Sequence, residues 1–467
     1  MGARWAAVLT FATALYGSVP RFSAWVPARW PWPDAQSLEL LAGTPVNCLL
    51  LRTYSPELIQ AANFRGVATL ALLTPGGDVL AAARRALAAK VTGLVLEGDF
   101  PEATAAAVRE AAGAPPEPVP VIELTARNRM PLDSKAPIIG TYQGVWPGIS
   151  PLDDGHSKAG PTGSMWIDTN TGFIRAARAW GDAELWIANQ PPPKTVVTGT
   201  RYLQVIADAA MSGARWVVAL DSDFAVRLRQ GDADSARDWS RVGALLRYFE
   251  AHPEWRAMRE AGGLALVQDP AKGGLVSGGI LDMIAVKHTP VRPVPRQLLT
   301  PDALEGASMA VNIDADALTS QQKEILRSFT RSGGTLLTAP PGWHDQGPAG
   351  ENITLGKAEV DQLNDIWSEM NATIGRRNLG VRLFNAASML SNMLISADGK
   401  TAVVQLVNYA DYPVESVAVH FLGGYKTATL LAPEGGNRPL EIYQTEDDGA
   451  GVDIDKVVVC ATIRLEK

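Results

Sequence analysis

Cysteine and histidine are scarce in this sequence, which limits the chemistry that it can carry. The chain has two cysteines, Cys48 and Cys460, which lie in apolar segments near opposite ends of its 467 residues. One widely separated pair does not make a disulfide framework, so buried thiols are expected. The five histidines are scattered, and no two of them have the spacing of zinc ligands. We therefore expect neither a bound metal nor another cofactor.

An excess of basic charge and a long apolar run after the N-terminus are also missing. The formal net charge is -7 at pH 7 and the isoelectric point is near 5.4. Without a basic stripe, the chain is not expected to take nucleic acid or an anionic membrane surface as its main partner. No later stretch reaches the roughly 18 uninterrupted apolar residues of a membrane span. A neutral small molecule or a carbohydrate is the partner that this composition favours.

The first 20 residues allow two interpretations. The segment MGARWAAVLTFATALYGS has one arginine, a short apolar run and the small-residue pattern Ala12-Thr13-Ala14, which are features of a secretory signal peptide. A buried first helix of the mature fold explains the same residues. The first interpretation predicts a secreted or periplasmic protein, and the second leaves a cytoplasmic location open.

Short apolar runs alternate with helical stretches from about residue 40 to 258. The runs are 45–51, 66–73, 91–99, 118–125, 136–145, 183–190 and 214–223. Nearly continuous apolar runs are typical of parallel strands that are covered on both faces. The repeat predicts an α/β fold, either a (β/α)8 barrel or an open doubly wound sheet, and its even spacing favours the barrel. An eighth strand is expected from the Trp- and Pro-rich segment 21–33, unless the barrel is incomplete.

Two further domains are predicted after a barrel over residues 21–260. Residues 261–375 restart the alternation of strand and helix, which predicts a small α/β domain with its own core. Residues 376–467 change to period-two strands separated by turn signals such as Asp398-Gly399, which predicts an antiparallel β-sandwich.

This order of domains resembles three-domain glycoside hydrolases of the β-galactosidase trimerisation type, whose middle domain is like a glutamine amidotransferase. The segment LVNYADYPVESVAVHF (406–421) is similar to the C-terminal sandwich of such enzymes. The resemblance covers the architecture of nearly the whole chain, without a shared catalytic motif, and implies activity on O-glycosyl bonds of a carbohydrate. An amidase needs a cysteine nucleophile, and residues 262–345 contain none. The middle domain is therefore expected to be structural or to form a homo-oligomer contact.

Polar residues follow several predicted barrel strands at the points where the loops begin, which is where barrels carry their reactive side chains. They are Glu97, Asp99, Glu123, Arg127, Asn128, Tyr142, Gln143, Asn189, Asp221 and Asp223. Glycoside hydrolysis needs two carboxylates on one mouth, one to protonate the leaving oxygen and one to attack or to activate water. We assign Glu123 as acid/base and Asp221 as nucleophile or base. The alternative for each carboxylate is that it caps the next helix.

The segment MWIDTN (165–170) adds a third catalytic candidate. It resembles the Trp-x-Asp-x-Asn stretch of α-glycosidase barrels, in which the aspartate is the nucleophile, and this resemblance selects Asp168 and Asn170. A long polar loop precedes it where the family has a strand, so substrate binding or helix capping by Asp168 stays open. Trp146 and Trp166 are expected to stack on sugar rings beside the mouth.

Together these features predict a glycoside hydrolase with a carboxylate pair in a Trp-lined barrel mouth. Glu97, Tyr142, Gln143, Asn170, Asn189 and Asp223 are the expected polar contacts to the substrate. A barrel that binds carbohydrate without cleaving it is one alternative, since no clean acid and nucleophile motif is present. A structural or assembly protein is the other.

Overall fold

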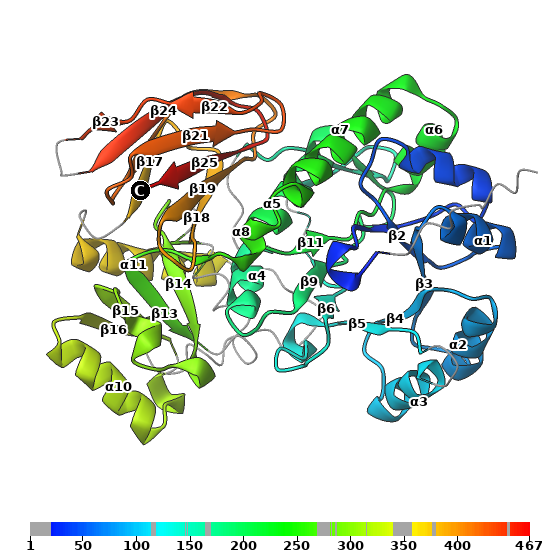
Figure 1. Ribbon diagram of the computed structural model, residues 1–467, viewed down its shortest axis with the longest axis horizontal. Coiled ribbons are helices and arrows are strands. Elements are labelled where there is room, and N and C mark those ends of the chain that lie inside the picture. The colour runs from blue at the N-terminus through cyan, green and yellow to red at the C-terminus, as the bar shows by residue number, and fades with distance from the viewer. Residues whose placement is uncertain are drawn as a thin grey trace, which may run out of the picture.

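The computed structural model describes residues 20–113, 118–144, 146, 148–163, 170–268, 281, 283–284, 287–313, 315–339, 357–375, 380–445 and 449–467. These residues form a parallel barrel, a small α/β unit and an antiparallel sandwich (Figure 1). In this part of the chain, no helix is both long and apolar enough to cross a bilayer.

The barrel closes with eight parallel strands. In sheet order they are β1 (Pro27–Arg29), β2 (Cys48–Leu51), β3 (Ala68–Leu73), β4 (Gly93–Glu97), β5 (Val121–Thr125), β6 (Ile138–Thr141), β9 (Glu184–Ile187) and β11 (Arg215–Trp216). Ala28 bridges Val218 in parallel, and Arg29 N donates to Val218 O at 2.8 Å, which joins the two ends of the sheet. The segment 21–33 thus supplies the predicted eighth strand, and the barrel prediction is confirmed.

Helices connect the strands of the barrel. They are α1 (Pro56–Phe64), α2 (Val79–Ala88), α3 (Glu102–Ala112), α4 (Thr171–Arg178), α5 (Gly199–Met211), α6 (Ser222–Arg229), α7 (Ala233–Glu250) and α8 (Glu254–Ala257). Ser55, Asp78 and Thr198 accept hydrogen bonds from backbone N–H groups of the first turns of α1, α2 and α5. The loops after β6 and β9 add a small sheet of β7 (Ile149–Pro151), β8 (Ser157–Ala159) and β10 (Thr195–Val197).

Alternate residues of the barrel strands fill its lumen, and the residues between them face the helices. Leu50, Leu70, Val95, Ile122 and Trp186 belong to one buried cluster inside the barrel. Because successive side chains of a strand point to opposite faces, this cluster fixes which neighbours point inward. This alternation determines which candidate site residues point into the lumen and which point toward the helices.

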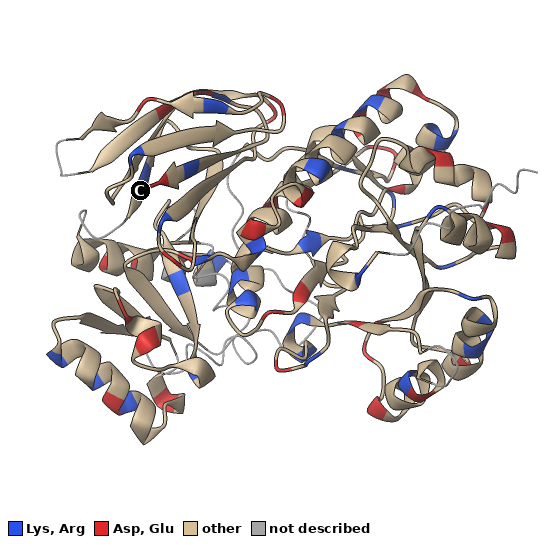
Figure 2. Ribbon diagram, viewed as in Figure 1, with Lys and Arg blue, Asp and Glu red and all other residues tan. Residues whose placement is uncertain are grey.

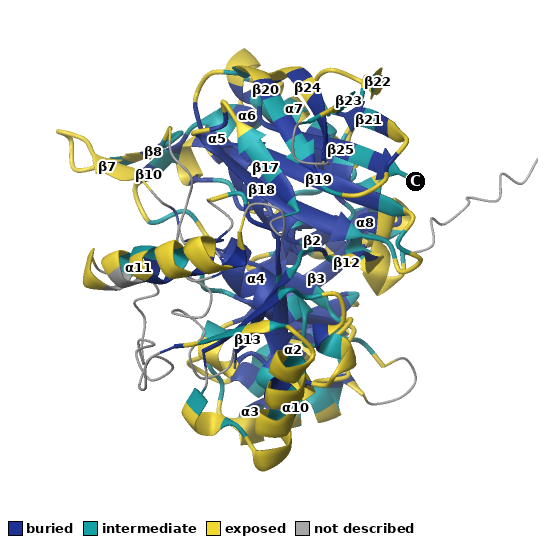
Figure 3. Ribbon diagram, turned by 90° about the vertical axis from the view of Figure 1, so that its left-hand side faces the viewer, coloured by how far each residue is buried: buried dark blue, intermediate teal, exposed yellow. Residues whose placement is uncertain are grey.

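The small α/β unit has a four-stranded parallel sheet in the order β14-β13-β15-β16. Its strands are β13 (Leu264–Gln268), β14 (Val291–Pro295), β15 (Met309–Asn312) and β16 (Thr335–Thr338). The helices α10 (Ser320–Arg331) and α11 (Lys357–Ile374) cover opposite faces of this sheet, and each leaves an exposed outer face (Figures 1 and 3). The likeness of this unit to a glutamine amidotransferase stays a prediction.

The sandwich pairs two antiparallel sheets. One has the order β12-β18-β19-β25-β21-β22 and the other the order β17-β20-β24-β23. The strands are β12 (Arg259–Glu260), β17 (Val381–Phe384), β18 (Met389–Ile395), β19 (Thr401–Asn408), β20 (Val414–Phe421), β21 (Thr427–Leu431), β22 (Arg438–Leu440), β23 (Tyr443–Gln444), β24 (Ala450–Val457) and β25 (Cys460–Glu466). Strand β12 belongs to this sandwich although it precedes the small α/β unit, whereas we expected every sandwich strand after residue 375. A strand of two residues is too short to leave a period-two pattern.

A buried polar junction joins the three units. Arg175 of α4 forms a bidentate ion pair with Glu260 of β12, with two hydrogen bonds of 3.0 Å. The Arg175 side chain is 2% exposed. The same guanidinium donates to Val291 O at the start of β14, at 2.8 Å. Asn392 of β18 donates to Glu260 at 3.4 Å and to Met211 O at 3.2 Å. Polar residues are buried on α4 because this helix packs against other units instead of facing water.

Both cysteines are free and buried, as predicted. Cys48 is in the lumen cluster of the barrel, Cys460 begins β25, and burial raises the pKa of both thiols. Since the thiolate is the reactive form, we expect neither thiol to react with Ellman's reagent in the native protein. Both should react once the chain is unfolded in guanidinium chloride. Fast labelling of either thiol in the native state would contradict this burial.

Candidate functional site

The carboxyl ends of the eight barrel strands meet at one mouth, which is where barrel enzymes carry their chemistry. Arg29 is the last residue of β1 and Glu97 the last residue of β4. Glu97 lies two residues beyond the lumen residue Val95, so its side chain points into the barrel. These two positions bring a carboxylate and a guanidinium together at the floor of the mouth.

Glu97 and Arg29 form a bidentate ion pair that crosses the lumen. Arg29 Nη1 donates to Glu97 Oε2 at 2.9 Å, and Nη2 donates to Oε1 at 2.7 Å. Nη2 also donates to Ala188 O at 2.6 Å, while Gln190 Nε2 lies 3.4 Å from Glu97 Oε1. Both side chains are about one-tenth exposed. Glu97 was predicted at the mouth, but Arg29 was not. An arginine inside an apolar Trp- and Pro-rich segment is unusual, and this feature of the sequence could have indicated a buried partner for a carboxylate.

Glu123 does not reach the mouth, so its assignment as acid/base is wrong. Its neighbours Ile122 and Leu124 both point into the lumen, so the Glu123 side chain points outward to the helix layer. There it forms an ion pair with Arg109 of α3, which also contacts Glu102. Glu123 therefore joins β5 to the helix that precedes it.

Asp221 is a buried helix cap, which corrects its assignment as nucleophile. Asp221 Oδ1 accepts from Phe224 N at 3.0 Å in the first turn of α6. Its Oδ2 accepts from the Tyr202 hydroxyl at 2.6 Å and from Val197 N at 3.2 Å. Burial, followed by the adjacent Asp221 carboxylate, raises the pKa of Tyr202, which keeps this hydroxyl a donor. Both carboxylate oxygens are thus engaged in holding β10, α5 and α6 together.

Asp223 is exposed at the start of α6. It lies in the first turn of α6 and forms an exposed i,i+4 ion pair with Arg227, at 2.9 Å. An exposed pair of this kind contributes little to stability. Asp223 is therefore a surface residue of the helix, and its predicted contact with the substrate stays a prediction.

A second polar group forms around Arg127, which contacts residues from other loops of the barrel. Arg127 follows β5, and its backbone N–H donates to Gln143 Oε1 at 2.8 Å. Its Nη2 donates to Asn170 Oδ1 at 2.6 Å, and its guanidinium lies 4.7 Å from the centre of the Phe173 ring. Gln143 and Asn170, both predicted contacts, are thus brought together. Asn170 is 1% exposed and directly follows the segment that carries Asp168.

Of the predicted aromatic and amide contacts, Tyr142 lies at the mouth and Trp146 does not. Tyr142 is partly buried against the lumen cluster at the end of β6. Trp146 is 7% exposed and packs edge-to-face against Tyr202 and Trp216, with ring centres 6.4 and 5.8 Å away. A tryptophan this deeply buried is not placed to stack on a sugar, which corrects its predicted role.

Asn189 supports the same aromatic cluster. Its Oδ1 accepts from Trp216 Nε1 at 2.9 Å, and its side chain is 3% exposed. Asn189 follows the lumen residue Ala188 and therefore points to the helix side, away from the mouth. Trp166 and Asp168 lie outside the described residues, so their predicted roles stay predictions.

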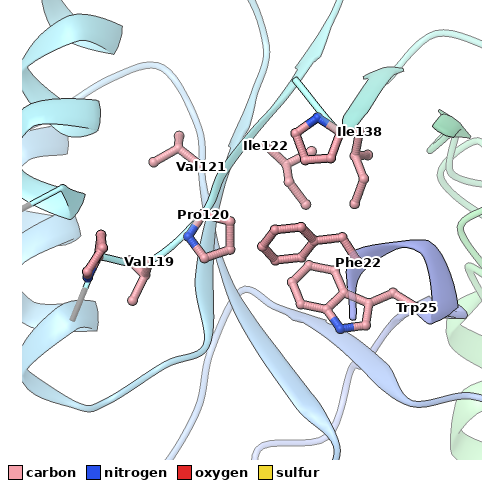
Figure 4. Close-up of a pocket in the computed structure, with 9 residues that line it drawn as sticks. Phe22, Trp25, Val119, Pro120, Val121, Ile122 and Ile138 are labelled. Atoms are coloured by element: carbon pink, nitrogen blue, oxygen red, sulfur yellow. The ribbon is translucent and has the colours of Figure 1, made fainter. Parts of the chain in front are cut away.

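An apolar cavity of about 330 Å³ opens at the opposite end of the barrel (Figure 4). Phe22 and Trp25 form one side, and Pro120, Ile122 and Ile138 lie across from them at the starts of β5 and β6. None of the described residues that line it is titratable, and the amino end of a barrel is the end that supports stability. Within the described part of the chain, no group of three or more metal-ligating side chains is present.

Comparisons with known proteins identify the fold of the chain. No protein-family model matches it, and no curated protein sequence does. The solved structure of α-L-fucosidase isoenzyme 2 from Paenibacillus thiaminolyticus is similar over 96% of this chain and 98% of its own, with a TM-score of 0.61 at 10% identity. A rhamnosidase from Novosphingobium sp. PP1Y matches 78% of this chain and 38% of its own, with a TM-score of 0.41 at 13% identity. The likeness to the fucosidase structure shows the fold alone, which is a (β/α)8 barrel followed by a β-sandwich.

Proposed function

We propose that this protein cleaves a glycosidic bond at the carboxyl mouth of its barrel. The observation that carries the proposal is the Glu97–Arg29 pair, a carboxylate fixed at the mouth in the lumen of a glycoside hydrolase-like barrel. The guanidinium grips both carboxylate oxygens and sets their direction. A bidentate guanidinium uses one lone pair of each oxygen, so Oε2 of Glu97 keeps a lone pair for the substrate. The oriented carboxylate can then face the positive charge that develops on the sugar ring.

The second carboxylate that hydrolysis requires is proposed to be Asp168. Its resemblance to the nucleophile of α-glycosidases selects it, and Glu123 and Asp221 are excluded by their structural contacts. Asn170, two residues further along, contacts Arg127 at the polar group formed by the loops after β5 and β6. Tyr142, Gln143 and Gln190 would supply further contacts to sugar hydroxyls.

The test is a screen of the full chain against chromogenic glycosides, followed by matched variants. An α-L-fucoside is the first substrate to try, because the solved structure of similar fold is named as a fucosidase. For a glycoside that is cleaved, Glu97→Gln and Asp168→Asn should each lower kcat/KM by about a hundredfold or more. The control is Glu123→Gln, since it makes the same change on the outer side of the neighbouring strand and should leave kcat/KM nearly unchanged.

Two outcomes would count against catalysis by this pair. Equal turnover by the wild-type protein and a folded Glu97→Gln variant would remove Glu97 from the mechanism. Saturable glycan binding without turnover of any glycoside would favour the alternative of a binding protein. That alternative has its own support, since two of the three predicted catalytic carboxylates are occupied by structural contacts.

A further inference from the structure

A second site candidate lies in the small α/β unit, far along the chain from the barrel mouth. A groove of about 490 Å³ runs between α10 and the edge strand β16, and Asn312 at the carboxyl end of β15 lines it. Leu326 of α10 and Leu336 of β16 form its apolar walls. Its volume is within the range of small-molecule sites, and open α/β sheets bind ligands beyond the carboxyl ends of their strands.

Among the described residues that line the groove, every charged one is basic. Lys323, Arg327 and Arg331 follow one another at four-residue spacing along α10, where Figure 2 shows basic positions on the helix. Arg327 and Arg331 contact Glu324 at 3.5 and 2.9 Å, but these pairs are exposed and therefore weak. Lys323 has no ion pair among the described residues. In a chain with a net charge of -7, this local excess of positive charge favours an anionic ligand.

Asn312 supplies the second, independent observation. Asn312 is 2% exposed, and its Oδ1 atom is buried without a hydrogen-bond partner. Asn312 is two residues beyond Ala310, which packs with Leu326 under α10, so its side chain lies on the α10 face of the sheet. A buried acceptor without a donor costs stability, and such groups are uncommon in folded proteins. A ligand with a hydroxyl group would provide the missing donor.

We propose that this groove binds a small organic anion that carries hydroxyl groups, of the sugar-phosphate or sugar-acid class. The anionic group contacts Lys323, Arg327 and Arg331, the carbon body packs on Leu326 and Leu336, and a hydroxyl donates to Asn312 Oδ1. This site is separate from the barrel mouth and does not depend on glycoside cleavage there.

Isothermal titration of the full chain with four probes tests the proposal. Glucose 6-phosphate and glucuronate have both the anion and the hydroxyl groups, whereas glucose and inorganic phosphate each have one of them. We expect at least one of the first two to bind saturably, and more tightly than either simple probe by about tenfold. Which of the two binds better identifies the anionic group. Absence of saturable binding by both, or equal binding of inorganic phosphate, would overturn the proposal.

Charge variants locate the binding. Lys323→Gln should weaken binding by about tenfold, since a hydrogen bond to a charged group is lost. Lys400→Gln changes the same residue type at an exposed turn of the sandwich and should have no effect. An equal effect of the two variants would place the ligand elsewhere.

Asn312→Leu separates a binding role from a structural one. If Asn312 Oδ1 is unpaired until a ligand binds, leucine removes an unpaired buried acceptor from the free protein. Tm should then rise or stay level, while binding is lost. A fall in Tm of several degrees would mean that Asn312 supports the fold, and retained binding would mean that it does not contact the ligand. Either result would overturn its assigned role.

Discussion

Replacing Arg175 with methionine is expected to lower the free energy of unfolding by about 3–5 kcal/mol. The change leaves the Glu260 carboxylate, 11% exposed, without the guanidinium that grips both of its oxygens at 3.0 Å. It also removes the donor to Val291 O. Because the pair joins α4 to β12 and β14, its loss should loosen the contact of the barrel with both other units.

Urea unfolding followed by tryptophan fluorescence measures this effect, since eleven of the thirteen tryptophans precede residue 260. The double variant Arg175→Met, Glu260→Met should regain most of the loss, because no buried charge then lacks a partner. Arg237→Met, at a surface ion pair of α7, is the matched control and should change stability by less than about 0.5 kcal/mol. A loss below about 1 kcal/mol for Arg175→Met would show that the junction is not a major source of stability.

Acid is expected to destabilise the protein through His288. Burial, with a smaller effect of Lys287, lowers the pKa of His288 from 6.5 to about 4. In the unfolded chain this imidazole takes up a proton near its ordinary pKa, whereas in the folded protein it stays neutral until about 4. Between these values the unfolded state holds more protons, so the free energy of unfolding should fall by about 2–3 kcal/mol as the pH drops.

The variant His288→Asn isolates this contribution from that of other titrating groups. His288 has a φ of 59°, in the left-handed region that asparagine tolerates better than most residues, so the backbone should be retained. The difference in urea-unfolding free energy between wild type and variant should be largest at neutral pH and should shrink across the window from about 6.5 to about 4. His156→Asn, on an exposed turn, is the control. A difference that is constant with pH would contradict the titration of a buried His288.

The neighbour of His288 shows where this acid sensitivity would act. His288 Nδ1 lies 3.3 Å from Ser391 Oγ of β18, so the contact joins the small α/β unit to the sandwich. Protonation at this contact places a charge in a buried interface and disfavours it. We therefore expect the small unit and the sandwich to separate from each other before the barrel unfolds in acid.

The strands of the barrel could be predicted because they are continuous apolar runs, and the runs from 45–51 to 214–223 each contain one. The direction of a side chain within such a strand could not. Both faces of a parallel strand are buried, so Glu123 between Ile122 and Leu124 gives no sign of which face is the lumen. Only the neighbouring strands decide this, and they place Glu97 inward and Glu123 outward.

The partners of the polar residues could not be predicted from the local sequence either. Arg29 and Glu97 are 68 residues apart, and Arg175 and Glu260 are 85 residues apart. Asp221 is different, because an aspartate just before a helix is a common N-cap and the sequence offered that interpretation beside the catalytic one. Trp146 was misjudged because its edge-to-face partners, Tyr202 and Trp216, come from α5 and β11.

Strand β12 makes the small α/β unit an insertion within the sandwich. The chain leaves the sandwich at Gly262 and returns at Gly380, and both glycines pass Pro290: a Cβ on Gly262 would lie 2.5 Å from Pro290 O, and one on Gly380 would lie 3.5 Å from Pro290 Cγ. The inserted unit is thus tethered twice at nearly one point, which restrains its rotation more than a single linker would. During synthesis Arg259 is made well before its strand partner Ile395. The insertion can therefore fold before the sandwich closes around its two ends.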